Sequence, residues 1–204
     1  MVKKNTKEKL IETALNLIWK DSYASVSVDE ICKTSGVLKG SFYHYFPSKK
    51  DLARAALEQC CEQFRTTYNQ IFSPLNPPLQ RFEKMADCKI EMQEELLREN
   101  GYVMGCPTAG FRNDLSNQAE NSTDMGLGNI RQESLTYFKA ALKDLQDAGM
   151  IDSDIDIDLR AQEIFIFITG TMTTARMTND LAFLKTSFKP SLMRIIGIKN
   201  YELD

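Results

Sequence analysis

A cluster of hydrogen-bond donors lies between positions 27 and 49 of the chain. Most of its members carry a hydroxyl, ammonium or imidazole group, and one is a glycine that permits close approach: Ser27, Lys39, Gly40, Ser41, Tyr43, His44 and Lys49. Donors of these types bind phosphate oxygens, and lysine also reaches the edge of guanine in the major groove. The cluster therefore predicts contact with double-stranded DNA.

The side chains of this cluster have different expected roles. Lys39 is expected to donate to a guanine edge or to a phosphate, and Ser41 and Tyr43 to offer their hydroxyl groups. His44 and Lys49 suit the backbone phosphates, because Lys49 stands in the first turn of a helix whose free amide groups also attract anions.

The aromatic residues around position 44 also allow a simpler interpretation, in which they only fill a core. We expect this of Phe42 and Phe46, which should pack inward together with Leu38. Tyr43 and His44 stand beside lysines on a short helix, and for these two we expect contact with DNA.

Catalytic and metal chemistry find little support in the sequence. His44 is the only histidine and belongs to the DNA cluster, so no Cys–His pair is available for nucleophilic catalysis. No phosphate-binding glycine loop is present. The cysteines lack metal-ligand spacing, and they are Cys32, Cys60, Cys61, Cys88 and Cys106. We therefore predict that the protein is not an enzyme and holds no metal or cofactor.

The same cysteines bear on the cellular compartment. Their number is odd, and the basic stretch 1–9 is not followed by the apolar segment of a secretory signal. The longest strongly apolar run, residues 164–168, is far too short to span a bilayer. These features predict a cytoplasmic protein with reduced thiols and no membrane partner.

Charge is distributed unevenly along the chain. The net charge is −3, but residues 1–55 contain ten Lys/Arg against six Asp/Glu, and the remainder contains fifteen against twenty-two. A basic N-terminal part on an acidic body suits a protein that meets phosphate with one end only. Chance fluctuation is the alternative explanation for so modest an asymmetry, so charge alone does not decide the function.

Helical periodicity runs through almost the whole chain, with no alternation typical of strands. Asn5 with Glu8, and Ser27 with Glu30, fit capping boxes, and Gly36 fits a left-handed helix end. About nine helices are expected, over residues 5–20, 28–34, 39–45, 48–71, 79–99, 108–116, 129–148, 158–178 and 181–197. The fold class is therefore all-α, in a chain of 204 residues that can bury a substantial core.

The first three predicted helices match a helix-turn-helix, with a tight turn between the second and the third. In that motif the later helix, here residues 39–45, enters the major groove. We predict a DNA-binding domain over 1–50 and a helical domain for effector binding and dimerisation over 51–204.

Residues 28–31 (Val-Asp-Glu-Ile) and 36–52 (GVLKGSFYHYFPSKKDL) resemble the signature of the tetracycline-repressor (TetR) family. The resemblance covers about residues 6–55, and chain length and helix count agree beyond it. Leu38 departs from the pattern, because the family usually begins this helix with a small or polar residue. The resemblance implies a homodimer with recognition helices roughly 34–36 Å apart, and an effector that releases operator DNA.

The last two predicted helices carry more apolar surface than one buried face needs. Residues 164–168 are apolar around the whole helix circumference, while Gly170, Thr171, Thr174 and Ala175 permit close helix approach. These features predict half of a four-helix dimer interface, built from Phe165, Ile168, Met172, Ala175, Phe183, Phe188 and Leu192. The alternative is a fully internal helix in a monomer.

Aromatic, methionine and cysteine residues of the middle helices supply a candidate effector pocket. They are Phe64, Tyr68, Phe82, Met85, Met92, Tyr102, Cys106, Phe111, Tyr137 and Phe138. Such a lining predicts a mostly apolar or aromatic small molecule. The alternative is that most of these side chains are ordinary core.

Cys106 stands out because it follows Gly105 and precedes Pro107, at the expected start of a short helix. A thiol at a helix N-terminus gains reactivity. A subset of the TetR family looks similar here, with Gly-Cys before its sixth helix, and some relatives sense electrophiles or oxidants through cysteine. Cys106 is therefore either such a sensor or a small buried residue near the pocket.

These features together predict a repressor that binds a palindromic operator and is released by a small effector. A transcriptional activator, or a DNA-binding protein that recruits partners through the same N-terminal part, is the alternative.

Overall fold

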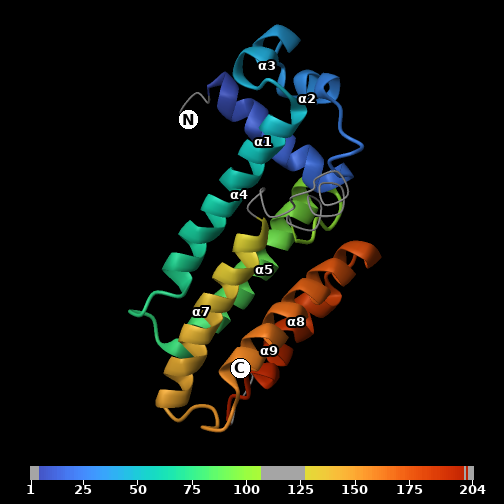
Figure 1. Cartoon of the computed structure of the whole chain (residues 1–204). Helices are drawn as coiled ribbons and strands as arrows, with labels where there is room; N and C mark the ends of the chain where they lie inside the picture. Colours follow the sequence, from blue (N-terminus) through green and yellow to red (C-terminus); the bar gives the residue numbers. More distant parts are fainter. Residues whose placement is uncertain (1–4, 107–126, 200, 202–204) are drawn as a thin grey trace. The chain divides into compact units, whose positions relative to one another are not determined.

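The computed structural model describes residues 5–106, 127–199 and 201, and all regular elements in these residues are helical (Figure 1). In chain order they are α1 (Thr6–Asp21), α2 (Val28–Ser35), α3 (Lys39–Tyr45), α4 (Lys49–Ile71), α5 (Pro78–Asn100), α7 (Leu127–Asp147), α8 (Ile157–Thr178), the π-helical segment η2 (Leu184–Phe188) and α9 (Lys189–Ile196). The all-α prediction is confirmed. The helix predicted over 108–116 lies outside the described residues.

Helix ends follow local sequence signals. The Asn5 side chain accepts from the Glu8 amide at 2.9 Å, and the Glu8 carboxylate accepts from the Asn5 amide at 3.0 Å, so the predicted capping box closes. Ser27 caps α2 by accepting from the Glu30 amide at 3.1 Å. Gly36 ends α2 at φ +68°, a backbone conformation that glycine adopts without a steric penalty.

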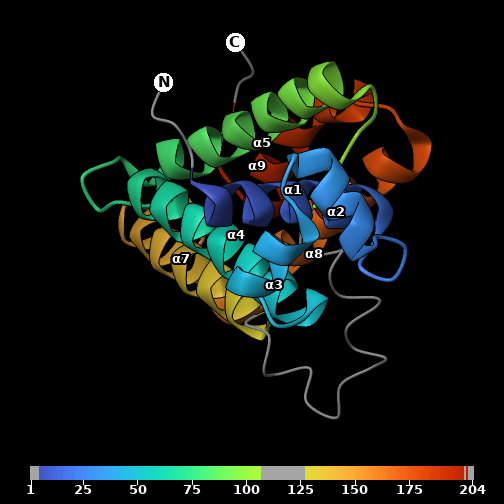
Figure 2. The same cartoon turned by 90° about the horizontal axis from the view of Figure 1, so that it is seen from above.

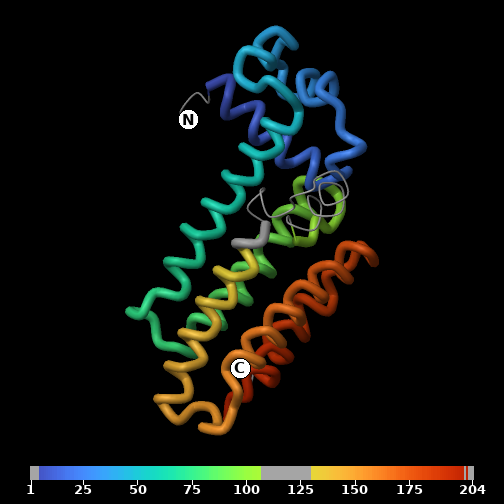
Figure 3. The backbone as a smooth tube through the Cα atoms, in the orientation of Figure 1, coloured from blue at the N-terminus to red at the C-terminus, as the bar shows by residue number. Residues whose placement is uncertain are grey.

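The helix predicted over 181–197 is wound differently near its start. Residues 184–188 form a π-helical turn before α9 begins at Lys189. Pro190 has no N–H to donate to the preceding turn, which disturbs the regular hydrogen-bond ladder at this point. Figure 3 shows the chain reversing direction between α8 and α9.

The chain divides into two compact units, and the division falls within α4. Of the described residues, the first unit contains 5–64 and 127–128, and the second contains 65–106, 129–199 and 201. The first unit packs α1, α2, α3 and the start of α4 around fully buried side chains, among them Leu10, Ile18, Ile31, Phe42 and Leu52.

The second unit is a helical bundle built from the rest of α4, α5, α7, α8 and α9. Figure 2 shows α7 running beside α4, and α9 contacts both α5 and α8. Its core includes the fully buried Phe82, Phe138 and Phe188. Within the described residues, no helix combines the length and apolar character needed to cross a membrane.

Candidate nucleic-acid interface and effector site

The recognition helix α3 presents polar side chains and buries one aromatic ring. Phe42 has no exposed surface and packs edge-on against Tyr43, with ring centroids 5.1 Å apart. Tyr43 is 51% exposed, and Lys39 and His44 are also exposed, while Ser41 is partly buried. The buried ring anchors α3 to the first unit, so the donors are left on its outer face.

Leu38 does not pack inward as predicted. It is 80% exposed, because it precedes the first helical turn with an extended backbone (φ −67°, ψ 144°) and therefore lies off the buried face of α3. Its side chain makes no capping hydrogen bond, as expected for an apolar residue at this position. Hydropathy alone was a misleading guide at this position.

Lys39 forms an ion pair within the first unit. Its ammonium lies 2.7 Å from the carboxylate of Asp29 on α2, and both side chains are largely exposed. The hydrogen bond to Asp29, followed by the charge of Asp29, raises the pKa of Lys39. The lysine predicted to meet DNA is thus charged and held by a partner on the neighbouring helix.

Lys49 has a role within the first unit that was not predicted. Its ammonium donates to the carbonyl oxygens of Tyr23 at 2.7 Å and Val26 at 2.8 Å, and lies 4.1 Å from the centroid of the Tyr23 ring. These contacts tie it to the loop between α1 and α2, and the phosphate contact of Lys49 stays a prediction. A partner 23 or 26 residues away cannot be read from local sequence.

Ser27 and Gly40 keep their DNA contacts as predictions. Ser27 is exposed, and its oxygen already caps α2. A Cβ atom added to Gly40 would meet nothing within 4 Å. The described residues therefore leave room for a side chain at this position, and close approach of Gly40 to DNA stays a prediction.

Several predicted pocket residues come together in the second unit. The ring of Tyr68 lies 5.6 Å from that of Tyr137 and 6.4 Å from that of Phe138, and Phe82 lies 6.1 Å from Phe138. The ring of Phe72, which was not predicted, contacts all four, at 5.3 to 5.7 Å. This aromatic cluster joins α4, α5 and α7.

The remaining predicted pocket residues are placed less uniformly. Met85 is fully buried, and Met92, Tyr102 and Cys106 are partly buried. Phe64 is partly buried and belongs to the first unit. Phe111 lies outside the described residues.

The segment 103–106 is held by hydrogen bonds from two helices. On the α5 side, Gln93 bonds both the N–H and the carbonyl group of Gly105. On the α8 side, Asn179 accepts from the amide of Val103 at 2.8 Å, and Arg176 donates to the carbonyl of Met104 at 3.1 Å. Cys106 therefore follows directly after a segment with a defined position.

Lys89 lies next to this segment and beside Tyr68. Its Nζ atom is 5.5 Å from the centroid of the Tyr68 ring. Burial is the largest single influence on the pKa of Lys89 and acts to lower it, but Tyr68, Cys106 and Cys88 together raise it above the ordinary value. The Tyr68 hydroxyl also forms a hydrogen bond with the Lys89 ammonium group, and the Lys89 side chain is partly buried in the second unit.

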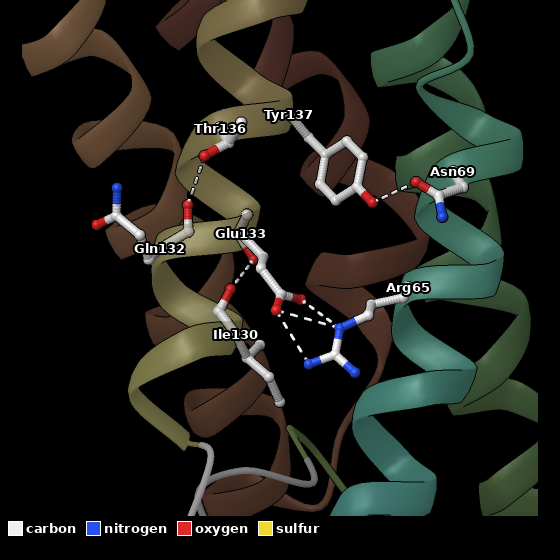
Figure 4. A network of polar contacts seen from close by, with 8 residues as sticks. Arg65, Asn69, Ile130, Gln132, Glu133, Thr136 and Tyr137 are labelled. Carbon is white, nitrogen blue, oxygen red and sulfur yellow. Dashed lines mark hydrogen bonds and ion pairs between the residues drawn. The ribbon is translucent and has the colours of Figure 1, made fainter. Parts of the chain in front are cut away.

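Polar contacts tie α4 to α7 (Figure 4). Arg65 donates to both carboxylate oxygens of Glu133 at 3.0 to 3.1 Å, and Tyr137 donates to the side-chain oxygen of Asn69 at 2.5 Å. Burial, and then the charge of Glu133, raises the pKa of Tyr137. These contacts link α4 directly to α7 within the second unit.

Sequence reasoning missed Lys89 and Gln93, although a signal was present. They follow the fully buried Met85 by four and eight residues on α5, so they occupy the face where apolar residues are expected. Polar side chains in a buried helical stripe need partners, and for Gln93 that partner is Gly105.

Most residues predicted for the dimer interface lie inside the second unit instead. Phe188 and Leu192 have no exposed surface, and Ile168, Met172 and Ala175 are buried as well. They fill the inner side of the bundle within one chain and are not available to a partner. Phe183 remains exposed and Phe165 partly so.

A different stripe of α8 faces outward. Its exposed residues recur at helical spacing, and they are Leu159, Gln162, Glu163, Ile166, Gly170, Thr173, Thr174 and Met177. Ile166 is 68% exposed, between the buried Ile164 and Ile168. The apolar run around the whole helix is thus divided, because Ile164 and Ile168 are buried, Phe165 and Phe167 partly buried, and Ile166 exposed.

The first unit defines a helix-turn-helix protein of the DNA-binding class, with α3 as its recognition helix. The model of the bacterial regulatory proteins of the tetR family matches residues 10–56. The transcriptional regulator AcuR of Cereibacter sphaeroides is 28% identical over 174 residues, which cover 83% of this chain and 76% of that protein.

Two further comparisons extend over most of the chain. A helix-turn-helix regulator from the lacX 3′ region of Lactococcus lactis subsp. lactis is 26% identical, over 91% of this chain and 90% of that protein. The crystal structure of regulatory protein TetR from Rhodobacter sphaeroides is 26% identical with a TM-score of 0.78, covering 92% of this chain and 96% of that one. Residues 10–56 thus match the DNA-binding domain of the tetR family, and the chain is similar to TetR-type transcriptional regulators over most of its length.

Proposed function

We propose that this regulator is a cytoplasmic, homodimeric repressor that binds a palindromic operator and is released by a small-molecule effector. Residues 1–50 form the DNA-binding domain, and residues 51–204 bind the effector and the second subunit. The observation that carries the proposal is the outer face of α3, where Lys39, Tyr43 and His44 are exposed over the buried ring of Phe42. No enzymatic role is part of the proposal.

The outward stripe of α8 supports a second copy of the chain as partner. It combines apolar side chains, Leu159, Ile166 and Met177, with the small residue Gly170, whose Cβ position opens onto free space within the protomer. Apolar surface repeated along a whole helix favours a partner helix of the same kind, related by two-fold symmetry. The exposed Phe183 extends the same type of surface beyond α8.

The aromatic cluster and the segment 103–106 support an effector site in the second unit. Effector binding there would bias α4 through its contacts with α7, and α4 continues directly from the helix-turn-helix. Such couplings are typically worth about 1–3 kcal/mol. We further propose that Cys106 reacts with electrophiles or oxidants, because Gln93 holds the residue before it in place and its side chain is partly exposed.

DNA binding is tested by footprinting the region upstream of the gene and by fluorescence anisotropy on the protected fragment. Lys39→Ala and Tyr43→Ala should weaken binding, whereas Lys143→Ala on α7 provides an exposed lysine control that should not. Absence of any preferred upstream fragment at low salt would contradict the proposal, since phosphate contacts are strongest there.

The direction of regulation and the role of Cys106 need separate measurements. Transcription of the neighbouring genes should rise when the gene is deleted, and a fall would show an activator. Cys106→Ser protein should stay on operator DNA when treated with hydrogen peroxide or a quinone, while the wild type is released. Equal release of both proteins would exclude the sensor role.

A further inference from the structure

Lys89 is a charged group without a charged partner among the described residues. Two carboxylates near Lys89 on α5 form ion pairs with other lysines. Asp87 pairs with Lys189 at 2.9 Å, and Glu94 pairs with Lys185 at 2.7 Å. Burying an ammonium group costs free energy unless an opposite charge or hydrogen bonds compensate it. Among the described residues Lys89 has a hydrogen bond to Tyr68 but no opposite charge, so its partly buried setting favours a negative charge supplied by a ligand.

Two of the groups that surround Lys89, Tyr68 and Cys88, do not supply that charge. Burial raises the pKa of Tyr68 and the pKa of Cys88, so both side chains are neutral near pH 7. A neutral phenol and a neutral thiol offer hydrogen-bonding atoms and polarisable surface only. These neutral groups can solvate the Lys89 ammonium group, but they do not neutralise its positive charge.

Lys89 also has a defined position, which a binding residue requires. It lies one helical turn before Gln93 on α5, and Gln93 holds Gly105, so Cys106 and Lys89 belong to the same local site. The ring of Tyr68 connects this point to the aromatic cluster through Tyr137.

We propose that Lys89 binds the carboxylate of a small organic acid, whose apolar part lies against the aromatic side chains beside Tyr68. This inference deepens the proposed function, on which its regulatory meaning rests, by giving the mostly apolar effector one anionic end. A carboxylate suits a single ammonium group. A phosphate group normally recruits several donors, such as a helix N-terminus or an arginine fork.

Binding is tested by isothermal titration of the full-length protein with benzoate and butyrate, compared with the neutral isosteres benzamide and butyramide. At least one acid should bind while its amide does not. Lys89→Met should weaken binding of the acid about 10- to 100-fold, the loss expected for one charge-assisted hydrogen bond. Lys84→Met is the matched control, since Lys84 is an exposed lysine of the same helix that bonds Asn76.

Two results would overturn the proposal directly. Equal titration curves for acids and amides, including the absence of binding by both acids, would show that the site does not select a carboxylate. A marked loss of stability of ligand-free Lys89→Met and Lys89→Gln in thermal unfolding would show that the lysine already pairs with a carboxylate of the chain itself. We expect both variants to be at least as stable as the wild type.

Operator release is measured separately, so that the two proposals fail in different ways. If the acid binds through Lys89 but leaves the operator complex intact, the anion site stands and the effector part of the proposed function is wrong. If the protein binds no DNA, the repressor proposal fails, and the titrations still decide the role of Lys89.

Discussion

The side-chain amide of Gln93 bonds both backbone polar groups of Gly105, donating to its carbonyl oxygen at 3.0 Å and accepting from its N–H at 2.8 Å. Gln93 is completely buried on α5. Its side-chain amide hydrogen-bonds the backbone of Gly105 in the way that the backbone of a neighbouring strand would. The pairing satisfies the amide and the peptide together, which matters because unpaired polar groups in a core are costly. It sets the position of Cys106 relative to Lys89.

Replacing Gly105 by alanine should destabilise the second unit. Gly105 has φ +68°, and an added Cβ would lie 3.0 Å from the carbonyl oxygen of Met172 and 3.1 Å from Cβ of Arg176. Gly101→Ala is the matched control, because Gly101 has φ +79° but open space around its Cβ position. Urea unfolding should show a cost of about 1–2 kcal/mol for Gly101→Ala from backbone strain.

Gly105→Ala should add about 1–3 kcal/mol to that cost through overpacking. Equal losses for the two variants would mean that the contacts with α8 do not constrain this segment.

Placing a charge on the outward stripe of α8 should break the dimer. Ile166→Glu puts a carboxylate in the middle of an apolar surface, where a two-fold interface would bring two such charges together. Analytical ultracentrifugation should show a monomer for this variant and a dimer for the wild type. Leu75→Glu introduces the same charge at another highly exposed leucine, between α4 and α5, and should remain dimeric.

Removing the carboxylate next to Lys39 should strengthen DNA binding. Asp29→Asn releases the ammonium group from its ion pair and removes a negative charge beside the recognition helix. The plot of log K against log salt should become steeper by up to about one unit, as expected for one additional phosphate contact. Asp147→Asn breaks the Lys143–Asp147 pair on α7, which has the same 2.7 Å separation, and should leave the slope unchanged.

Stability should fall as the pH rises past the ordinary pKa of a thiol. Burial is the largest cause that raises the pKa of Cys88, and the charge of Glu91 adds to it. The unfolded chain loses this proton at about pH 8.5, while the folded chain keeps it, so the contribution is complete below that pH and is lost above it. Cys88→Ala should make the decline of the urea midpoint between about pH 8 and about pH 9.5 shallower.

Burial, and then the charge of Asp29, also raises the pKa of Cys32. Part of the decline of the urea midpoint with pH should therefore remain in Cys88→Ala. Cys88→Ser, which keeps a polar group of similar size but does not titrate, should behave like the alanine variant. An unaltered pH course in both would contradict the assignment.

Local chemistry was enough to predict the helices and the exposed face of α3. Capping by Asn5 and Ser27 and the left-handed turn at Gly36 involve neighbours within a few residues, so their sequence signals are direct. The burial of Phe42 and exposure of Tyr43 likewise follow from helical periodicity. The prediction that Leu38 packs inward was wrong because Leu38 lies just before α3, so the periodicity of that helix does not apply to it.

The prediction of the dimer-interface residues was wrong for another reason. An all-round apolar helix such as residues 164–168 shows that two sides are covered, but not which side is covered by the same chain. Only the packing of α8 and α9 decided that Ile168 and Phe188 face inward and Ile166 faces outward.

The amino-acid sequence by itself determined an all-helical chain with a helix-turn-helix near its N-terminus, because helix ends and periodicity depend on residues a few positions apart. Tertiary structure alone decided that Lys49 binds the loop after α1, that Gln93 holds Gly105, and that Lys89 lies beside Tyr68. These partners are 12 to 26 residues distant or on different helices, and only the packing of the helices brings their polar groups together.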